Sequence, residues 1–202
     1  MTQKIKLLSL IIVSSIFISG CSLNKTAKNQ PNQNMNLNTP ATPTANITVS
    51  PTGIQTKGNP VVSLKTKDGE ILIKLYQDKA PKTVANFIKK SDSGYYNNLP
   101  FHRVIAGFMA QGGDPTGTGM GGGKQDSELN NVPFVRGSLG LARTAETKSV
   151  SNDSQFFICF TTEGCQHLTS DYVNFGEVIS GLDVLDKIVQ GDKIISITSK
   201  TK

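Results

Sequence analysis

The stretch FHRVIAGFMAQGGDPTGTGMGG, from Phe101 to Gly122, carries the densest structural signals in the chain. Apolar residues dominate 101–105 and 108–111, with Gly107 between the two runs, and this pattern predicts two short strands. The glycines that follow predict a long loop over about 112–131, because glycine allows tight turns and close backbone approach. The stretch therefore indicates a strand-rich fold with a glycine-rich loop beside it.

Short strand signals recur on both sides of this stretch. Alternating runs at 61–66 and 71–76 flank Asp68-Gly69, which predicts a hairpin. Further strands are predicted over 138–142, 155–160, 174–178 and 193–198. One helix is predicted from Ala80-Pro81 to about Ser91, and a second, amphipathic helix over 182–189. Many short strands with only two helices indicate a barrel or a sandwich.

The chain divides into three parts by composition. Residues 59–202 form one predicted domain, because about 140 residues can bury roughly two-thirds of their unfolded surface. Residues 21–58 are rich in Asn, Thr, Gln and Pro and cannot bury enough apolar area to fold. They predict a flexible tether with a root-mean-square span of very roughly 35 Å.

The first 20 residues predict a signal peptide. Lys4 and Lys6 precede an apolar run over 7–18, which is short for a membrane-spanning helix of about 20 residues. The run ends in Ile18-Ser19-Gly20-Cys21, which resembles the lipobox of bacterial lipoproteins. That resemblance implies an extracytoplasmic protein anchored to a bacterial membrane by a lipid on Cys21. The alternative is an ordinary secretory signal with an incidental cysteine.

Cysteine usage and charge narrow the possible partners. Beside Cys21 the chain has Cys159 and Cys165, and the sequence leaves open whether they form a disulfide. No Cys/His cluster has metal-ligand spacing, so neither a metal nor another cofactor is expected. Removal of residues 1–20 leaves 19 basic and 15 acidic side chains, a net charge of +4 without a basic run. Nucleic acid is therefore not an expected partner.

Four separated blocks resemble the cyclophilin family of peptidyl-prolyl cis–trans isomerases. They are the stretch 101–122, SLGLA at 138–142, NDSQFFI at 152–158 and VNFGEV at 173–178. The resemblance implies a mainly β fold, a closed eight-stranded antiparallel β-barrel capped by two α-helices. It also implies an isomerase that turns X–Pro bonds in exported or unfolded client polypeptides. A closed barrel leaves no strand edge to pair, so a monomer is expected.

Carried over by position, the resemblance implies an active site around Arg103. This residue matches the family's catalytic arginine, and Phe108 and Gln111 are expected to act with it. The expected substrate-binding residues are Met109, Ala142, Arg143, Gln155, Phe157, His167, Leu168 and Tyr172. The apolar pocket for the proline ring is expected to consist of Phe108, Met109, Phe157 and Leu168. Because neighbours on a strand point to opposite faces, Phe157 rather than Phe156 is expected in the groove.

The physical demands of X–Pro rotation suit such a site. Twisting the amide breaks its resonance, and the barrier is about 18–20 kcal/mol. No bond is made or broken, so the reaction needs no nucleophile or metal. A fixed guanidinium can donate to the prolyl nitrogen, which recovers its lone pair in the twisted state, more strongly than in either ground state. Arginine is always charged and rigid in its fork.

Three positions depart from common family patterns. Arg143 stands where the family more often has Asn, so backbone contacts are expected there. His167 aligns where many members have Trp, a residue that helps bind cyclosporin-type drugs, so weak drug binding with retained activity is expected. Tyr172 stands where others have His, and bacterial members often have Tyr.

Two further motifs and one other class of protein are alternatives to this interpretation. His102 with Ser151 or Ser154 could suggest a hydrolase, but no nucleophile-elbow motif is present, and a structural hydrogen-bonding role is expected for His102. GTGMGG at 117–122 matches GxGxxG, yet no helical pattern follows it, so no dinucleotide site is expected. The main alternative is a binding module whose groove holds proline-containing segments, with turnover incidental.

Overall fold

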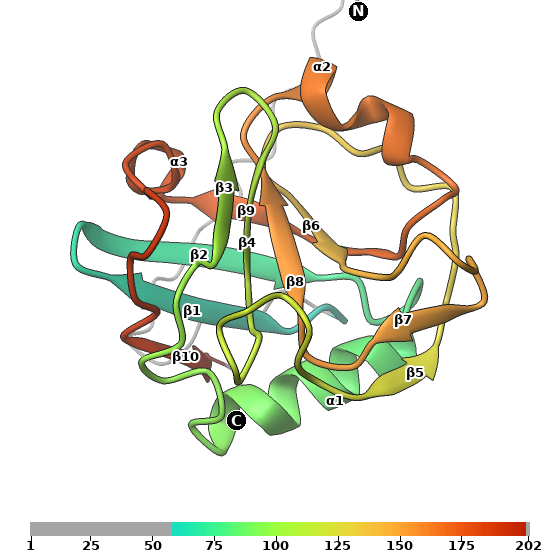
Figure 1. Cartoon of the computed structure of the whole chain (residues 1–202), viewed down its shortest axis with the longest axis horizontal. Coiled ribbons are helices and arrows are strands. Elements are labelled where there is room, and N and C mark those ends of the chain that lie inside the picture. The colour runs from blue at the N-terminus through green and yellow to red at the C-terminus, as the bar shows by residue number, and fades with distance from the viewer. Residues whose placement is uncertain (1–57, 201–202) are drawn as a thin grey trace, which may run out of the picture. The chain divides into compact units, whose positions relative to one another are not determined.

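The computed structural model describes residues 58–200, and Figure 1 labels its strands and helices. The predicted signal peptide (1–20), Cys21 and the predicted tether (21–58), apart from Gly58, lie outside the described residues, as do 201–202. Within the described part, no helix has the length and apolar character needed to cross a membrane.

Eight antiparallel strands form one curled sheet with the order β10-β1-β2-β9-β6-β8-β4-β3. In Figure 1, β1, β2 and β10 run across β3, β4 and β8, which shows how strongly the sheet curls. The strands are β1 Val61–Thr66, β2 Gly69–Leu75, β3 Arg103–Ile105, β4 Met109–Gly112, β6 Ser138–Leu141, β8 Phe156–Cys159, β9 Asn174–Ser180 and β10 Ser196–Ser199. Each predicted strand therefore lies in this sheet: β1 has the predicted bounds, and the ends of the others are shifted by up to three residues.

The expected closed barrel is not what the structure shows. Among the described residues, the edge strands β3 and β10 share no ladder. The segments that precede them bridge the gap instead: the amide of Asn98 donates to the carbonyl of Ile194, and that of Phe101 to Asp192, both over 2.8 Å. Pro100 between them has no N–H to donate, and β3 is too short to extend a ladder. The expectation of a monomer was based on a closed barrel without free strand edges, and this structure does not supply that basis.

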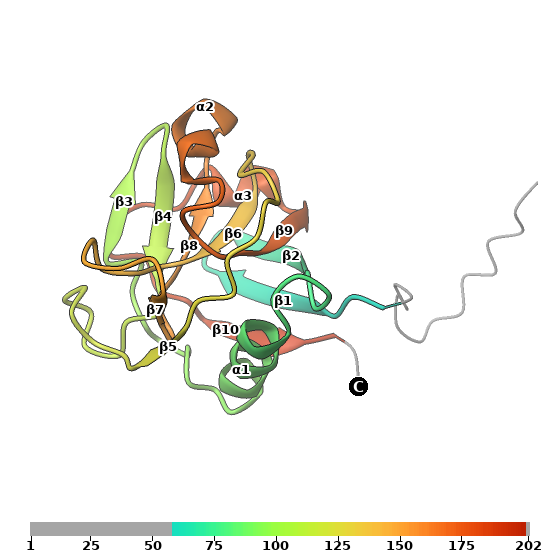
Figure 2. The ribbon, with the colours of Figure 1, turned by 90° about the vertical axis from the view of Figure 1, so that its right-hand side faces the viewer.

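The helices differ from the prediction at one end of the sheet. Helix α1 (Pro81–Asp92) agrees with it, with proline in the first turn. Helix α3 spans only Leu182–Leu185, because the chain then tightens into i→i+3 bonds such as that from the Ile188 amide to the Leu185 carbonyl. Helix α2 (Thr162–Cys165) and the 3-10 helix η1 (Gln166–Leu168) were not predicted. Figures 1 and 2 place α1 at one end of the sheet and α2 at the other.

A small second ladder was also missed. Strand β5 (Lys124–Asp126) lies in the segment predicted as loop and pairs with β7 (Val150–Asn152). This ladder holds the far end of the glycine-rich loop against the segment that leads into β8.

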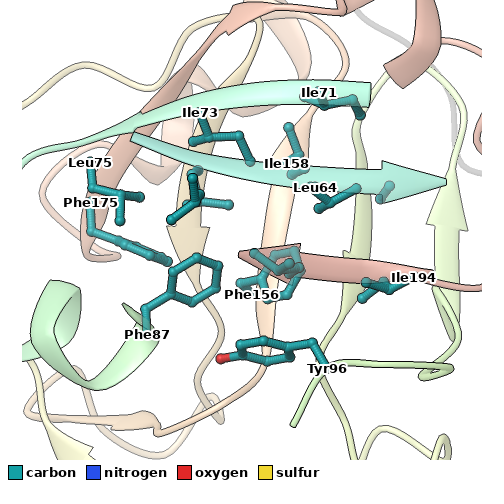
Figure 3. Close-up of a cluster of buried hydrophobic side chains, with 14 of the residues drawn as sticks. Leu64, Ile71, Ile73, Leu75, Phe87, Tyr96, Phe156, Ile158, Phe175 and Ile194 are labelled. Atoms are coloured by element: carbon teal, nitrogen blue, oxygen red, sulfur yellow. The ribbon is translucent and has the colours of Figure 1, made fainter. Parts of the chain in front are cut away.

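The main core fills the inside of the curled sheet (Figure 3). Phe87 of α1 meets Phe156 of β8 edge-on, with ring centroids 5.5 Å apart, and Phe175 of β9 at 5.2 Å. Tyr96 contacts the same Phe156 ring at 5.6 Å. Aromatic pairs of this geometry add to the free energy of burial, so they fix α1 across the open end of the sheet.

Strand β8 divides the buried side chains into two clusters. Phe156 and Ile158 belong to the main core, whereas Phe157 and Cys159 belong to a second, smaller cluster. This follows from the alternation of side chains along a strand. The expectation that Phe157 faces away from the main core is confirmed, and the second cluster forms the floor of the site described next.

Candidate active site

The β3–β4 hairpin presents a polar pair at one face of the sheet. Arg103 in β3 lies directly opposite Gln111 in β4, and facing residues of an antiparallel pair share one face. Nη1 of Arg103 donates to Oε1 of Gln111 over 3.2 Å and lies 4.0 Å from Sδ of Met109. The guanidinium carbon is 5.9 Å from the ring centroid of Phe108. The arginine is solvent-exposed, yet neighbours on the hairpin hold its guanidinium.

Phe157 forms an apolar wall beside this pair. It lies opposite Gln111 of β4 on one side and Gly140 of β6 on the other. A Cβ at position 140 would lie 2.1 Å from the Phe157 ring, so glycine leaves the room that the ring needs. The ring stacks on Phe134 with centroids 5.6 Å apart and meets Tyr172 edge-on at 5.8 Å. These contacts fix the orientation of the wall.

The side chains surround a pocket of about 90 Å³. Pockets for drug-sized ligands are commonly ≈300–1,000 Å³, so this one suits a single small group. Its lining consists of Arg103, Phe108, Met109, Gln111, Ala142, Arg143, Phe157, Leu168 and Tyr172. The structure thus brings together all but two of the residues expected at the site.

The two remaining residues lie beside the pocket. Gln155 is buried, and its Oε1 accepts a hydrogen bond from Nε2 of Gln111 over 2.9 Å. His167 is exposed and packs against Phe108, with ring centroids 5.7 Å apart. Gln155 therefore contacts the pocket through Gln111, and His167 lies outside the lining, against Phe108.

A second hollow of about 260 Å³ adjoins the pocket. The two share Gln111, Ala142 and Arg143 in their linings. The glycine-rich loop and Thr144, Glu146 and Thr147 bound the second hollow. Together they give space for a chain that extends beyond one ring.

The pocket is electropositive. Arg103 and Arg143 are the charged residues in its lining, which contains no carboxylate. The Arg143 side chain is held in place: Nε donates to the carbonyl of Asp171 over 2.9 Å and Nη1 to the carbonyl of Thr144 over 2.8 Å. A bound chain would therefore meet two fixed cations.

His102 departs from the expectation for it. Both ring nitrogens are buried, and residues 58–200 supply no hydrogen-bond partner for either, so the expected structural hydrogen bond is not made within the described residues. Burial lowers the pKa of His102; the carboxylate of Asp114 opposes this shift and the charge of Arg103 adds to it.

The two alternative catalytic motifs are not supported by the geometry. The hydroxyl of Ser151 hydrogen-bonds that of Ser127, and the hydroxyl of Ser154 donates to Asn152, so neither serine pairs with His102 in the described domain. The GxGxxG match at 117–122 leads into strand β5 rather than into a helix, and a dinucleotide site would need that helix.

Sequence reasoning left the disulfide open and missed the polar framework around the pocket. Cys159 and Cys165 form a disulfide, with Cα atoms 6.2 Å apart, which joins β8 to the helical segment before Leu168. Asp114 and Asn152 hydrogen-bond to the glycine-rich loop. The only sequence signal for these two residues is that both lie within blocks resembling the cyclophilin family.

Comparison with known proteins reveals close relatives. Residues 61–200 match the family described as cyclophilin type peptidyl-prolyl cis-trans isomerase/CLD. A peptidyl-prolyl cis-trans isomerase of Helicobacter pylori is 43% identical over 141 residues, which cover 67% of this chain and 83% of that protein. One from Synechococcus elongatus is 41% identical over 138 residues, covering 66% of this chain and 92% of that protein.

Solved structures agree with this result. The crystal structure of a cyclophilin type peptidyl-prolyl cis-trans isomerase of Cryptosporidium parvum superposes with a TM-score of 0.65 at 33% identity, covering 71% of this chain and 99% of that one. A second structure, in the presence of the dipeptide ala-pro, gives a TM-score of 0.62 at 34% identity, covering 68% and 97%.

A curled eight-stranded antiparallel sheet with a small pocket, lined by apolar side chains and by a held arginine, defines a mainly β protein of cyclophilin-like fold. The chain belongs to the family of cyclophilin-type peptidyl-prolyl cis–trans isomerases, and peptidyl-prolyl isomerisation is its enzyme activity.

Proposed function

We propose that the pocket holds the proline ring of an X–Pro segment while Arg103 stabilises the amide in its twisted state. The observation that carries the proposal is the position of the guanidinium in the lining of a pocket beside apolar side chains. Met109, Phe157 and Leu168 are buried side chains whose surfaces line the pocket and can exclude water from the ring. A hydrogen bond from a guanidinium beside the ring becomes stronger as the prolyl nitrogen recovers its lone pair.

The rate gain follows from differential binding. A planar amide offers its nitrogen no free lone pair, so the guanidinium gains little in either ground state and more at the top of the barrier. Loss of one such donor typically costs about 10²–10³ in rate. Arg103 is kept in place by Gln111, so less conformational entropy is lost when it donates.

Polypeptides rather than small molecules are the proposed substrates. The adjoining hollow extends the binding space beside Gln111 and Arg143, which suits an extended chain around the proline. A relative has been solved in the presence of the dipeptide ala-pro, in line with X–Pro recognition here.

We further propose that the clients are exported or unfolded polypeptides met outside the cytoplasm, with the protein anchored through lipidated Cys21 and acting as a monomer. Disulfides persist in oxidising compartments, so the Cys159–Cys165 pair supports this location. Mass spectrometry of the mature N-terminus tests the anchor: a diacylglyceryl group on Cys21 is expected, and an unmodified terminus elsewhere would contradict it. Size-exclusion chromatography with light scattering tests the monomer.

The catalytic proposal is tested with a short X–Pro peptide whose cis and trans forms are resolved by exchange NMR. The wild type is expected to accelerate exchange, and Arg103→Ala to lose about 10²–10³ of kcat/KM while peptide binding persists. An Arg103→Ala variant as fast as the wild type would overturn the role of the guanidinium. If the wild type and the variant both bind the peptide but neither accelerates exchange, the protein is a binding module instead.

A further inference from the structure

The glycine-rich loop is wrapped around one buried carboxylate. The Asp114 side chain has no exposed surface. Its Oδ1 accepts hydrogen bonds from the amide and the hydroxyl of Thr116, over 2.8 and 2.9 Å, and its Oδ2 accepts from the amide of Gly119. A buried charge is costly unless it is well hydrogen-bonded, so these donors are what allow the carboxylate to lie there.

The carboxylate is ionised at neutral pH. Burial raises its pKa, but the hydrogen bonds from Thr116, Gly121 and Gly119 outweigh that effect and lower the pKa of Asp114 to about 2. It therefore acts as a permanent acceptor for the loop amides. The loop closes so tightly around it that a Cβ at position 121 would lie 2.1 Å from Oδ1 of Asp114.

This closure directs two carbonyl groups of the loop toward Gln155. Nε2 of Gln155 donates to the carbonyl of Gly119 over 3.1 Å and to that of Gly121 over 2.8 Å. Asn152 holds the same carbonyl and the Gln155 backbone. Its Nδ2 donates to the carbonyl of Gly121, and its Oδ1 accepts a hydrogen bond from the backbone N–H of Gln155. Both protons of the Gln155 side-chain amide are thereby used.

The orientation of Gln155 then sets the orientation of Gln111. With its NH₂ group on the loop, Gln155 offers only Oε1 to Gln111, which must donate from Nε2 over 2.9 Å. Gln111 is left with Oε1 toward Arg103, which donates to it. If the loop carbonyls were absent, both amides could turn over and present an NH₂ group, a donor that cannot accept from a guanidinium.

We infer that Asp114 is a positioning residue for Arg103. By closing the loop, it fixes the polarity of the Gln155–Gln111 relay and so provides the acceptor that holds the guanidinium beside the pocket. The inference rests on the proposal that Arg103 is the catalytic donor.

The test compares Asp114→Asn with a matched control, Asp92→Asn. Asp92 also accepts from a backbone amide and a hydroxyl, both of Ser199, over 2.8 and 2.9 Å, on the α1 side of the sheet away from the pocket. In Asp114→Asn, kcat is expected to fall about tenfold with a small change in KM, within the range that a misplaced catalytic group can cost. Asp92→Asn is expected to leave both unchanged.

A double-mutant cycle separates positioning from general loosening. In an Arg103→Lys background, which lacks the planar fork, Asp114→Asn is expected to lower the rate less than twofold. If Asp114→Asn lowers the rate equally in both backgrounds, the inference is overturned. If Arg103→Lys and Arg103→Ala are as active as the wild type, the proposed mechanism is overturned instead.

Side-chain ¹⁵N NMR gives an independent readout: the side-chain amide resonances of Gln111 and Gln155 should shift in Asp114→Asn and not in Asp92→Asn. If Asp114→Asn does not fold, Thr116→Val, which removes one hydroxyl donor to the carboxylate, takes its place in all three measurements.

Discussion

The guanidinium carbon of Arg143 lies 4.4 Å from the ring centroid of Tyr172, where the pocket of about 90 Å³ meets the adjoining hollow. Cation–π contact of this geometry and two backbone carbonyl acceptors hold the cation at the groove. The nearby carboxylate of Asp171 forms an ion pair with Lys148. Arg143 therefore adds a second fixed positive charge close to Arg103.

This charge predicts a substrate preference. A peptide with Glu next to the proline is expected to have a higher kcat/KM than its Lys counterpart, by about two- to fivefold, because exposed charge pairs contribute roughly 0.2–1 kcal/mol. Arg143→Gln should reduce the difference, with Arg103 left as the remaining cation in the lining, and about 0.5 M salt should weaken it in the wild type. Lys89→Gln removes the same charge from α1 and should preserve the preference. Equal rates for both peptides in the wild type would contradict the prediction.

The Cys159–Cys165 disulfide is expected to stabilise the helical segment that carries Leu168. Closing a loop of this separation contributes about 2 kcal/mol in the chain-entropy model. The double variant Cys159→Ala/Cys165→Ala should lower the free energy of unfolding by about that amount and raise KM, since Leu168 lines the pocket. Urea unfolding with and without a reductant measures the free energy of unfolding, and the X–Pro exchange assay measures KM. A reductant should act on the wild type alone, and identical unfolding curves under both conditions would argue against the bond.

The pH dependence of rate and of stability should differ. Arginine stays charged and Asp114 has a pKa of about 2, so the isomerisation rate should be flat from about pH 6.5 to 9. A bell-shaped rate profile would contradict the mechanism.

Stability should instead fall in acid. Because the pKa of His102 is lowered in the folded state, the unfolded chain binds more protons once the pH drops below about 6.5, and the free energy of unfolding decreases. Asp114 adds a loss that begins only as the pH falls from about 4 toward 2. Urea unfolding between pH 2 and 8 checks this, and His102→Gln should flatten the slope near pH 6.

The sequence was sufficient for features set by local alternation. Strand β1 has the predicted bounds, and the opposite facing of Phe156 and Phe157 follows from the period of a strand. Features set by distant partners were not accessible. Strand β5 is three residues long and exists through its pairing with β7. Whether the sheet closes depends on the length of the edge strand β3, which is too short to pair with β10.

The polar framework of the site was hidden for a similar reason. Asp114 in a glycine-rich segment resembles any turn aspartate, and its burial becomes visible only when the loop folds back on Gln155. The hydrogen-bonding role expected for His102 rested on the rule that buried polar groups are usually paired, and the described chain supplies no partner for either ring nitrogen.

His167 predicts weak binding of cyclosporin-type drugs. Its ring is exposed and packs against Phe108 with centroids 5.7 Å apart, at the position where the family resemblance aligns a Trp. An imidazole covers less apolar surface than an indole, so His167→Trp should bury more drug surface and raise the affinity about tenfold or more, the change that roughly 1.4 kcal/mol gives. Isothermal titration with cyclosporin measures the affinity, and the X–Pro exchange assay should show an unchanged kcat/KM, since His167 does not line the pocket. His167→Phe serves as the control for aromatic character alone. Submicromolar affinity of the wild type would show that the imidazole suffices.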